Sequence, residues 1–121
     1  MTSSVLICDD SNMARKQVVR SLPPHWPVEV QTAKNGIEAL EILRNQAVDV
    51  LFLDLTMPEL DGVGVLQKIK EEDIACSVFV ISADVQPAMQ VKVLELGATA
   101  FLRKPVEAEV LMNELQVHGF L

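Results

Sequence analysis

Two short apolar runs in this chain end in carboxylates. Val5–Cys8 is followed by Asp9 and Asp10, and Val50–Leu53 is followed by Asp54. Four consecutive apolar residues without in/out alternation are typical of a strand buried on both faces, so each acid is expected where a strand emerges. Carboxylate oxygens suit Mg²⁺, and a carboxylate beside such an ion can act as a nucleophile toward phosphorus. The three acids are therefore candidates for metal-assisted phosphoryl chemistry, although a single strand-end Asp can equally be a solvated surface group.

Two more predicted strands end in groups that suit the same chemistry. Val78–Ile81 is followed by Ser82, and Ala100–Leu102 is followed two residues later by Lys104. A hydroxyl can bond a phosphoryl oxygen, and the long stem of a lysine lets its ammonium reach a point two strands away. Crowded acids repel one another, and a divalent cation would relieve that repulsion. Taken as a set, these residues favour a site that accepts a phosphoryl group.

Helices are expected between the strands. Helical spacing, an N-cap at Ser11, a helix-starting Pro87 and a helix-ending Gly97 predict five helices, over about residues 13–22, 37–46, 63–72, 87–96 and 107–117. Val28–Thr32 alternates apolar with polar residues, as an edge strand half covered by helix would. Five strands alternating with five helices predict an α/β fold, a doubly wound five-stranded parallel sheet of the flavodoxin-like (βα)5 type.

The strand order of such a fold would bring the polar ends together. In the order 2-1-3-4-5, the third strand lies between the first and the fourth, so Asp10 and Ser82 would bracket Asp54. No linker, repeat or low-complexity tract divides the sequence. Residues 1–121 are therefore expected to form one domain.

Composition narrows the function classes. The formal net charge of −7 opposes nonspecific nucleic-acid binding, which depends on Lys and Arg neutralising phosphates. Cys8 and Cys76 fall in predicted apolar strands without CxxC spacing and are expected to be buried thiols in a reducing, cytoplasmic setting. His25 and His118 are far apart, which disfavours a histidine-built metal site, and no apolar run approaches the length of a membrane span.

Together these motifs resemble the receiver domain of bacterial two-component response regulators, over essentially the whole chain. The resemblance rests on five short motifs in order, namely Asp9-Asp10, Asp54 followed by Met57-Pro58, Asp61-Gly62, Ser82-Ala83 and Lys104-Pro105. It implies a signalling switch rather than a turnover enzyme. The implied partners are a sensor histidine kinase or phosphotransfer protein and a downstream protein target, with no direct nucleic-acid contact and no membrane insertion.

Roles at the metal site also follow from the resemblance. Asp54 would be the phosphoacceptor, forming an aspartyl phosphate, and the cofactor would be Mg²⁺. Asp10, Asp54 and the backbone carbonyl of Thr56 would hold the ion, and Asp9 would contribute through water.

The remaining implied roles concern the phosphoryl group and the switch. Ser82 would bond one phosphoryl oxygen and Lys104 another, the Lys104–Pro105 peptide would be cis, and Phe101 would be the switch aromatic. The chain departs from the family at two of these positions. Ser82 stands where Thr is commoner, and Phe101 replaces the frequent Tyr, so its ring has no hydroxyl to bond.

Other classes of protein remain open on the sequence alone. A haloacid-dehalogenase-like phosphatase would need a second Asp two positions after the nucleophile, where this chain has Thr56. A phosphorylation-independent binding module, or a receiver that keeps the fold without being phosphorylated, would need none of the chemistry. A flavodoxin-like FMN carrier is disfavoured because the turn after the first strand is acidic. The chain ends soon after its fifth helix, so we expect either a stand-alone receiver or the front of a longer protein.

Overall fold

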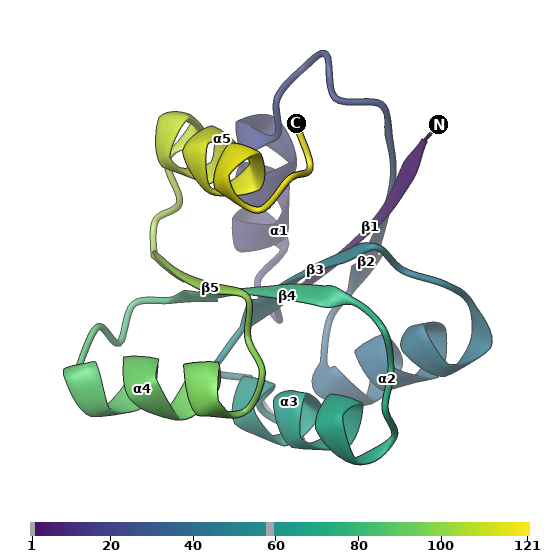
Figure 1. The fold of residues 1–121 in the computed structure, drawn as a ribbon, viewed down its shortest axis with the longest axis vertical. Helices are drawn as coiled ribbons and strands as arrows, with labels where there is room; N and C mark the ends of the chain where they lie inside the picture. The colour runs from purple at the N-terminus through teal and green to yellow at the C-terminus, as the bar shows by residue number, and fades with distance from the viewer. Residues whose placement is uncertain (1, 58–59) are drawn as a thin grey trace.

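A computed structural model describes residues 2–57 and 60–121. Strands and helices alternate along the chain (Figure 1), with bounds β1 Ser3–Cys8, α1 Asn12–Ser21, β2 Val28–Ala33, α2 Gly36–Asn45, β3 Val50–Asp54, α3 Gly62–Glu71, β4 Ser77–Ser82, α4 Pro87–Glu95, β5 Ala100–Arg103 and α5 Ala108–Val117. The predicted helices are confirmed to within one residue at each end. Proline begins α4, and Gly97 has the left-handed φ of 99° expected just past the end of that helix.

The five strands form one parallel sheet in the order β2-β1-β3-β4-β5, which confirms the predicted topology. Figure 1 shows α1 and α5 on one face and α2, α3 and α4 on the other. Because all strands run the same way, their carboxyl ends meet at one edge of the sheet. The first and fourth strands flank the third, as the doubly wound order requires.

Apolar side chains fill a layer on each face of the sheet. Along β3, Leu51 and Leu53 pack against the α2–α3–α4 layer, whereas Val50 and Phe52 pack against the α1–α5 layer. All four are at most 1% exposed. A strand buried on both faces has no polar side to present, which is why its sequence shows an unbroken apolar run. None of the helices in the two described ranges has the length and apolar character needed to cross a bilayer.

Two predictions from the sequence need correction, one on Cys76 and one on β2. Cys76 lies in the segment before β4 and is half-buried, so it is not a strand residue. The edge position of β2 is confirmed, but its valine face is not covered as predicted. Val28 is partly buried and packs against the α1–α5 layer, whereas Val30, which pairs with Val5 of that layer, is 38% exposed, so the layer covers only part of the valine face.

Helix α3 begins directly against the end of β3. Asp61 is its N-cap and accepts a hydrogen bond from the backbone N–H of Gly64 at 2.8 Å. A Cβ on Gly62 would lie 2.5 Å from the carbonyl oxygen of Asp54, so a side chain there would push the helix away from the strand end. The glycine therefore permits the close approach that defines one wall of the acidic edge.

Candidate functional site

The three acids predicted at the strand ends lie together at the carboxyl edge of the sheet. Cys8 pairs with Leu53, so the next residues along β1 and β3, Asp9 and Asp54, emerge at the same level. One carboxylate oxygen from each of Asp9, Asp10 and Asp54 lies within 4.8 Å of the others. Asp9 is 4% and Asp54 5% exposed, whereas Asp10 is exposed to solvent. The cluster thus has two buried members and one open side.

Lys104 reaches this cluster from the segment after β5. Its Nζ lies 2.9 Å from Oδ2 of Asp9 and 3.5 Å from Oδ1 of Asp54, so one ammonium bridges the two buried acids. The Lys104–Pro105 peptide bond is cis, as the family resemblance implied. The sequence reading gave Lys104 a role toward phosphoryl oxygens, and its direct ion pair with Asp9 was not anticipated.

Burial is the largest single influence on the pKa values of Asp54 and Lys104. Burial and the neighbouring charge of Asp9 raise the pKa of Asp54 from its ordinary 3.8 to about 6, against the opposing effects of Lys104 and of a backbone hydrogen bond from Thr56. For Lys104, burial alone would lower the pKa, but the hydrogen bond to Asp9 and the charges of both acids raise it. Asp54 is therefore a carboxylate at neutral pH that is held at an energetic cost, and Lys104 stays protonated beside it.

Ser82 ends β4, beside Asp54. It is 2% exposed, and its Oγ accepts a hydrogen bond from the backbone N–H of Asp84 at 3.0 Å. Asp84 in turn accepts one from the N–H of Gln86, the N-cap of α4, at 3.1 Å. Because a hydroxyl that accepts one bond can still donate its hydrogen, Ser82 keeps the capacity to bond an anion. A chain of two short hydrogen bonds thus links this hydroxyl to the start of α4.

Two other residues with predicted roles, Phe101 and Thr56, are described in the structure. Phe101 is half-buried on β5, opposite Val80, and packs against the α2–α3–α4 layer. Thr56 follows β3 and is exposed, with its backbone bonded to Asp54. Pro58, part of the motif after Asp54, lies outside the described residues.

Arg15 and Ser11 belong to this edge but were not predicted as site residues. Arg15 donates from Nη1 to the backbone carbonyl oxygen of Asp9 at 2.6 Å and from Nη2 to Oδ1 of Asn12 at 3.3 Å. The N–H of Ser11 donates to Oδ1 of Asp9 at 2.9 Å. The spacing in the sequence could have suggested this contact, because Arg15 lies about one helical turn beyond the segment that carries the two acids. Any residue can supply a backbone carbonyl, so the residue types alone did not predict this contact.

The donor set fits a small, hard divalent cation. Three carboxylates offer oxygen ligands, and the exposed position of Asp10 leaves room for water and a phosphate, which is how Mg²⁺ is usually held. Such an ion would also favour the ionised form of Asp54, whose pKa is raised by burial and by the charge of Asp9. The arrangement can therefore hold a metal, offer a carboxylate oxygen to phosphorus and pair an ammonium with a phosphoryl oxygen.

The fold and the site together define one class of protein. Its features are a doubly wound sheet, acids at the ends of the first and third strands, and a lysine after the fifth strand. The family model described as the response regulator receiver domain matches residues 5–116. The chain therefore belongs to the response regulator receiver domain family and is a receiver domain of two-component signalling.

Individual relatives agree with this assignment. The chain is 30% identical over 115 residues to chemotaxis protein CheY of Bacillus subtilis, covering 95% of this chain and 96% of that protein. The solved structure of chemotaxis response regulator CheY4 of Vibrio cholerae matches with a TM-score of 0.86 at 28% identity, over 100% of both chains. A protein-glutamate methylesterase/protein-glutamine glutaminase of Rhodospirillum rubrum is 38% identical over 104 residues, which cover 85% of this chain but 28% of that protein. The domain thus occurs in relatives of very different length.

Proposed function

We propose that residues 1–121 form one receiver domain that acts in the cytoplasm as a phosphorylation-controlled switch. Asp54 accepts a phosphoryl group from a sensor histidine kinase or a phosphotransfer protein. The observation that supports this function is the convergence of three acids and Lys104 at the carboxyl edge of the sheet. Like charges so close together are costly for packing alone, and they suit a site that gains a metal and a phosphoryl group.

In the transfer step, one oxygen of the Asp54 carboxylate attacks the phosphorus of a phosphohistidine. An O–P bond forms as the N–P bond breaks, and the imidazole leaves after taking up a proton. Little covalent chemistry is left for the protein, so its residues act by positioning and by neutralising charge. The ammonium of Lys104, 3.5 Å from Oδ1 of Asp54, is placed to pair with a phosphoryl oxygen.

A magnesium ion would be held by Asp10, Asp54 and the backbone carbonyl of Thr56, with Asp9 contributing through water. When bound, Mg²⁺ supplies charge neutralisation and in-line orientation of the phosphoryl group. Asp9 meanwhile keeps Lys104 in place through their 2.9 Å ion pair. The buried acids therefore divide the work, Asp54 as nucleophile and Asp9 as the anchor of the ammonium.

Phosphorylation changes the structure by adding a charge near −2 at Asp54. Ser82 turns its hydroxyl toward a phosphoryl oxygen, which pulls on the hydrogen bonds through Asp84 to the N-cap of α4. Phe101 on β5 repacks in response, and partner binding changes through α4 and β5. To move the population from 1:99 to 99:1, the phosphoryl contacts must favour the active state by about 5.5 kcal/mol.

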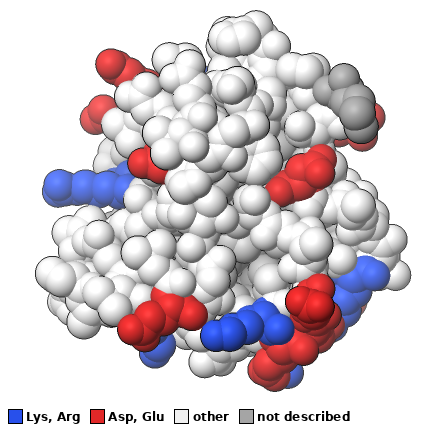
Figure 2. Space-filling view, viewed as in Figure 1, with Lys and Arg blue, Asp and Glu red and all other residues white. Residues whose placement is uncertain are grey.

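The downstream target is a protein, and direct nucleic-acid contact is not part of the proposal. On the face drawn in Figure 2, the described Lys and Arg side chains are interspersed with Asp and Glu, mostly along the margin where α3 and α4 lie in Figure 1. The net charge of −7, and the scatter of positive charges on this face, make the chain poorly suited to neutralise a run of phosphates there.

Labelling with a small acyl phosphate tests the proposal without a kinase. The wild-type protein is expected to gain one phosphoryl group, seen by intact mass, when acetyl phosphate and MgCl₂ are both present. Asp54→Asn is expected to gain none, because an amide is not a nucleophile toward phosphorus. A chelator is expected to abolish labelling of the wild type.

Asp61→Asn is the matched control. Asp61 is an exposed acid close in sequence to Asp54, and Asn serves equally well as the N-cap of α3, so this variant is expected to label like the wild type. Labelling of Asp54→Asn at the wild-type level, or labelling in chelator, would overturn the assignment. Steady turnover of a phosphate ester would instead support a hydrolase.

A further inference from the structure

The backbone and side chain of Asp9 are engaged at every polar atom. Its N–H donates to the carbonyl oxygen of Ala33 at 3.1 Å, and Oδ1 accepts from the N–H of Ser11 at 2.9 Å. Its Oδ2 accepts from Lys104 at 2.9 Å, and its backbone carbonyl oxygen accepts from Arg15 at 2.6 Å. Asp9 is therefore fixed in place, and among the described residues the side chain that bonds its carbonyl oxygen is Arg15.

Asp10 contrasts with its neighbour. Its side chain is exposed and makes none of the hydrogen bonds or ion pairs found within residues 2–57 and 60–121, so its direction depends on its backbone. The peptide group between Asp9 and Asp10 is planar, and a contact that fixes the carbonyl oxygen of Asp9 also fixes the N–H and Cα of Asp10. The Arg15 bond therefore acts on Asp10 through one rigid peptide plane.

From this geometry we propose that Arg15 is a positioning residue that orients the Asp9–Asp10 peptide and so aims the Asp10 carboxylate at the metal site. The inference rests on the proposed function, in which Asp10 is a magnesium ligand. The guanidinium is itself braced, because its second nitrogen donates to Oδ1 of Asn12 at 3.3 Å. A planar guanidinium can span both acceptors at once, which a lysine ammonium on a shorter stem cannot do with the same geometry.

Charge and orientation predict opposite effects of removing Arg15. A guanidinium near a cation site repels the cation, so loss of its charge alone would tighten magnesium binding. Loss of an orienting contact would weaken binding, since outer contacts that hold ligands typically contribute about 10–100-fold in metal affinity. The sign of the change therefore separates a positioning role from a purely electrostatic one.

Magnesium binding can be measured directly by titrating MgCl₂ into the folded protein and following backbone amide NMR shifts. Arg15→Met removes the donors and the charge but keeps an unbranched stem, and its Kd for Mg²⁺ is expected to rise about tenfold. Arg15→Lys keeps the charge and is expected to bind about threefold more weakly than wild type. Lys16→Ala is the control, because Lys16 is the exposed neighbouring cation, with no side-chain bond among those described, and should bind like wild type or slightly more tightly.

The outcomes separate this inference from the proposed function. Wild-type protein that binds no Mg²⁺ would overturn both. Wild-type protein that binds Mg²⁺, together with a folded Arg15→Met that binds it as tightly or more tightly, would overturn the positioning role and leave the proposed function standing. Urea unfolding of each variant in chelator shows which are folded. If Arg15→Met does not fold, Arg15→Lys decides, because a wild-type Kd in that variant contradicts the role.

Discussion

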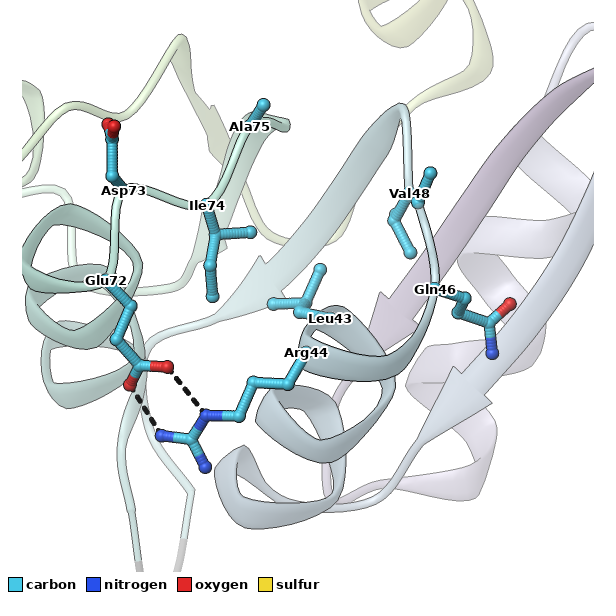
Figure 3. Close-up of a pocket in the computed structure, with 9 residues that line it drawn as sticks. Leu43, Arg44, Gln46, Val48, Glu72, Asp73, Ile74 and Ala75 are labelled. Carbon is cyan, nitrogen blue, oxygen red and sulfur yellow. Dashed lines mark hydrogen bonds and ion pairs between the residues drawn. The ribbon is translucent and has the colours of Figure 1, made fainter.

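At the carboxyl end of the sheet, two buried acids share the ammonium of Lys104. At the amino end, the exposed acid Glu72 forms an ion pair with the guanidinium of Arg44. Arg44 donates from Nε and Nη2 to the two carboxylate oxygens of Glu72, at 2.7 and 2.6 Å. Figure 3 shows this pair among the residues that line a cavity of about 420 Å³, together with the apolar Leu43 and Ile74. The two ends hold similar charges in opposite environments.

Their pKa shifts run in opposite directions. Burial and the charge of Asp9 raise the pKa of Asp54 to about 6, whereas the hydrogen bond from Arg44 lowers the pKa of Glu72. An acid whose ionised form is favoured stabilises the fold, and an acid whose ionised form is disfavoured is retained at a cost to stability. At the carboxyl end, charged groups are therefore retained at a cost to stability, as perturbed groups at functional sites often are.

Removing the shared ammonium should cause the largest loss of stability. Lys104→Met is expected to lower the free energy of unfolding by about 2 kcal/mol at neutral pH in chelator, because it leaves two buried acids without their counter-ion. The value is below that of a fully buried pair because Lys104 is 30% exposed at its side chain. Urea unfolding followed by circular dichroism measures it.

The double variant Lys104→Met with Asp54→Asn serves as the control. Removing one of the two acids should recover most of the lost stability, since the uncompensated charge is what destabilises the single variant. A Lys104→Met protein as stable as wild type would show that the buried acids do not depend on this ammonium.

Neutralising Asp54 should stabilise the fold. Between the ordinary pKa of 3.8 and the folded pKa of about 6, the folded state binds more protons at this carboxyl than the unfolded state, so stability falls as the pH rises through that window. The loss is complete above the folded pKa. Asp54→Asn, which does not titrate, is therefore expected to be more stable than wild type by about 2 kcal/mol at neutral pH in chelator.

The pH profile of this difference is its test. Urea unfolding of both proteins from neutral pH down to about pH 4 should show the advantage of Asp54→Asn shrinking as the wild-type carboxyl takes up its proton. An advantage that is constant across this range would mean that packing, and not ionisation, causes it. Saturating MgCl₂ should also reduce the advantage, because the cation stabilises the wild-type carboxylate.

The thiols of Cys8 and Cys76 lie at the carboxyl and amino ends of the sheet, so their reactivities compare the two ends. Cys8 lies under the acids, where burial and the charges of Asp9 and Asp54 raise its pKa to about 12, and burial raises the pKa of the half-buried Cys76, before β4, to about 11. The thiolate is the reactive form, so iodoacetamide should modify Cys76 first and Cys8 at least about tenfold more slowly in the folded protein. Mass spectrometry of timed samples measures both rates, and equal rates in urea are the control. Faster reaction at Cys8 would contradict the burial of the acidic edge.

The fold was largely readable from the sequence because local patterns determine it. Unbroken apolar runs such as Val50–Leu53 require burial on both faces, and caps and breakers such as Pro87 and Gly97 locate the helix ends. The pattern misled at Val30, since alternation shows that one face is apolar but not whether a helix extends far enough to cover it.

The placement of the acids could be predicted because parallel strands end at one edge, so topology alone brings Asp9 and Asp54 together. The sequence predicted that Lys104 lies near Asp54, but it did not predict the detailed contacts of the acids. Lys104 binds Asp9 as well as Asp54, and Arg15 binds a backbone carbonyl, and both contacts depend on side-chain conformations that residue spacing does not determine. The same holds for the Arg44–Glu72 pair, whose members are 28 residues apart.

The smallest effect is expected at the amino end. Arg44→Ala should change the midpoint of urea unfolding only slightly, because the side chains of Arg44 and Glu72 are 47% and 34% exposed and water competes for both charges. High salt should remove that small change, since exposed pairs are screened, but should leave most of the Lys104→Met effect, since buried charges are screened much less. Unfolding of both variants at low and high NaCl tests this. An Arg44→Ala change as large as that of Lys104→Met, or equally insensitive to salt, would show that the two ends of the sheet hold their charges in the same way.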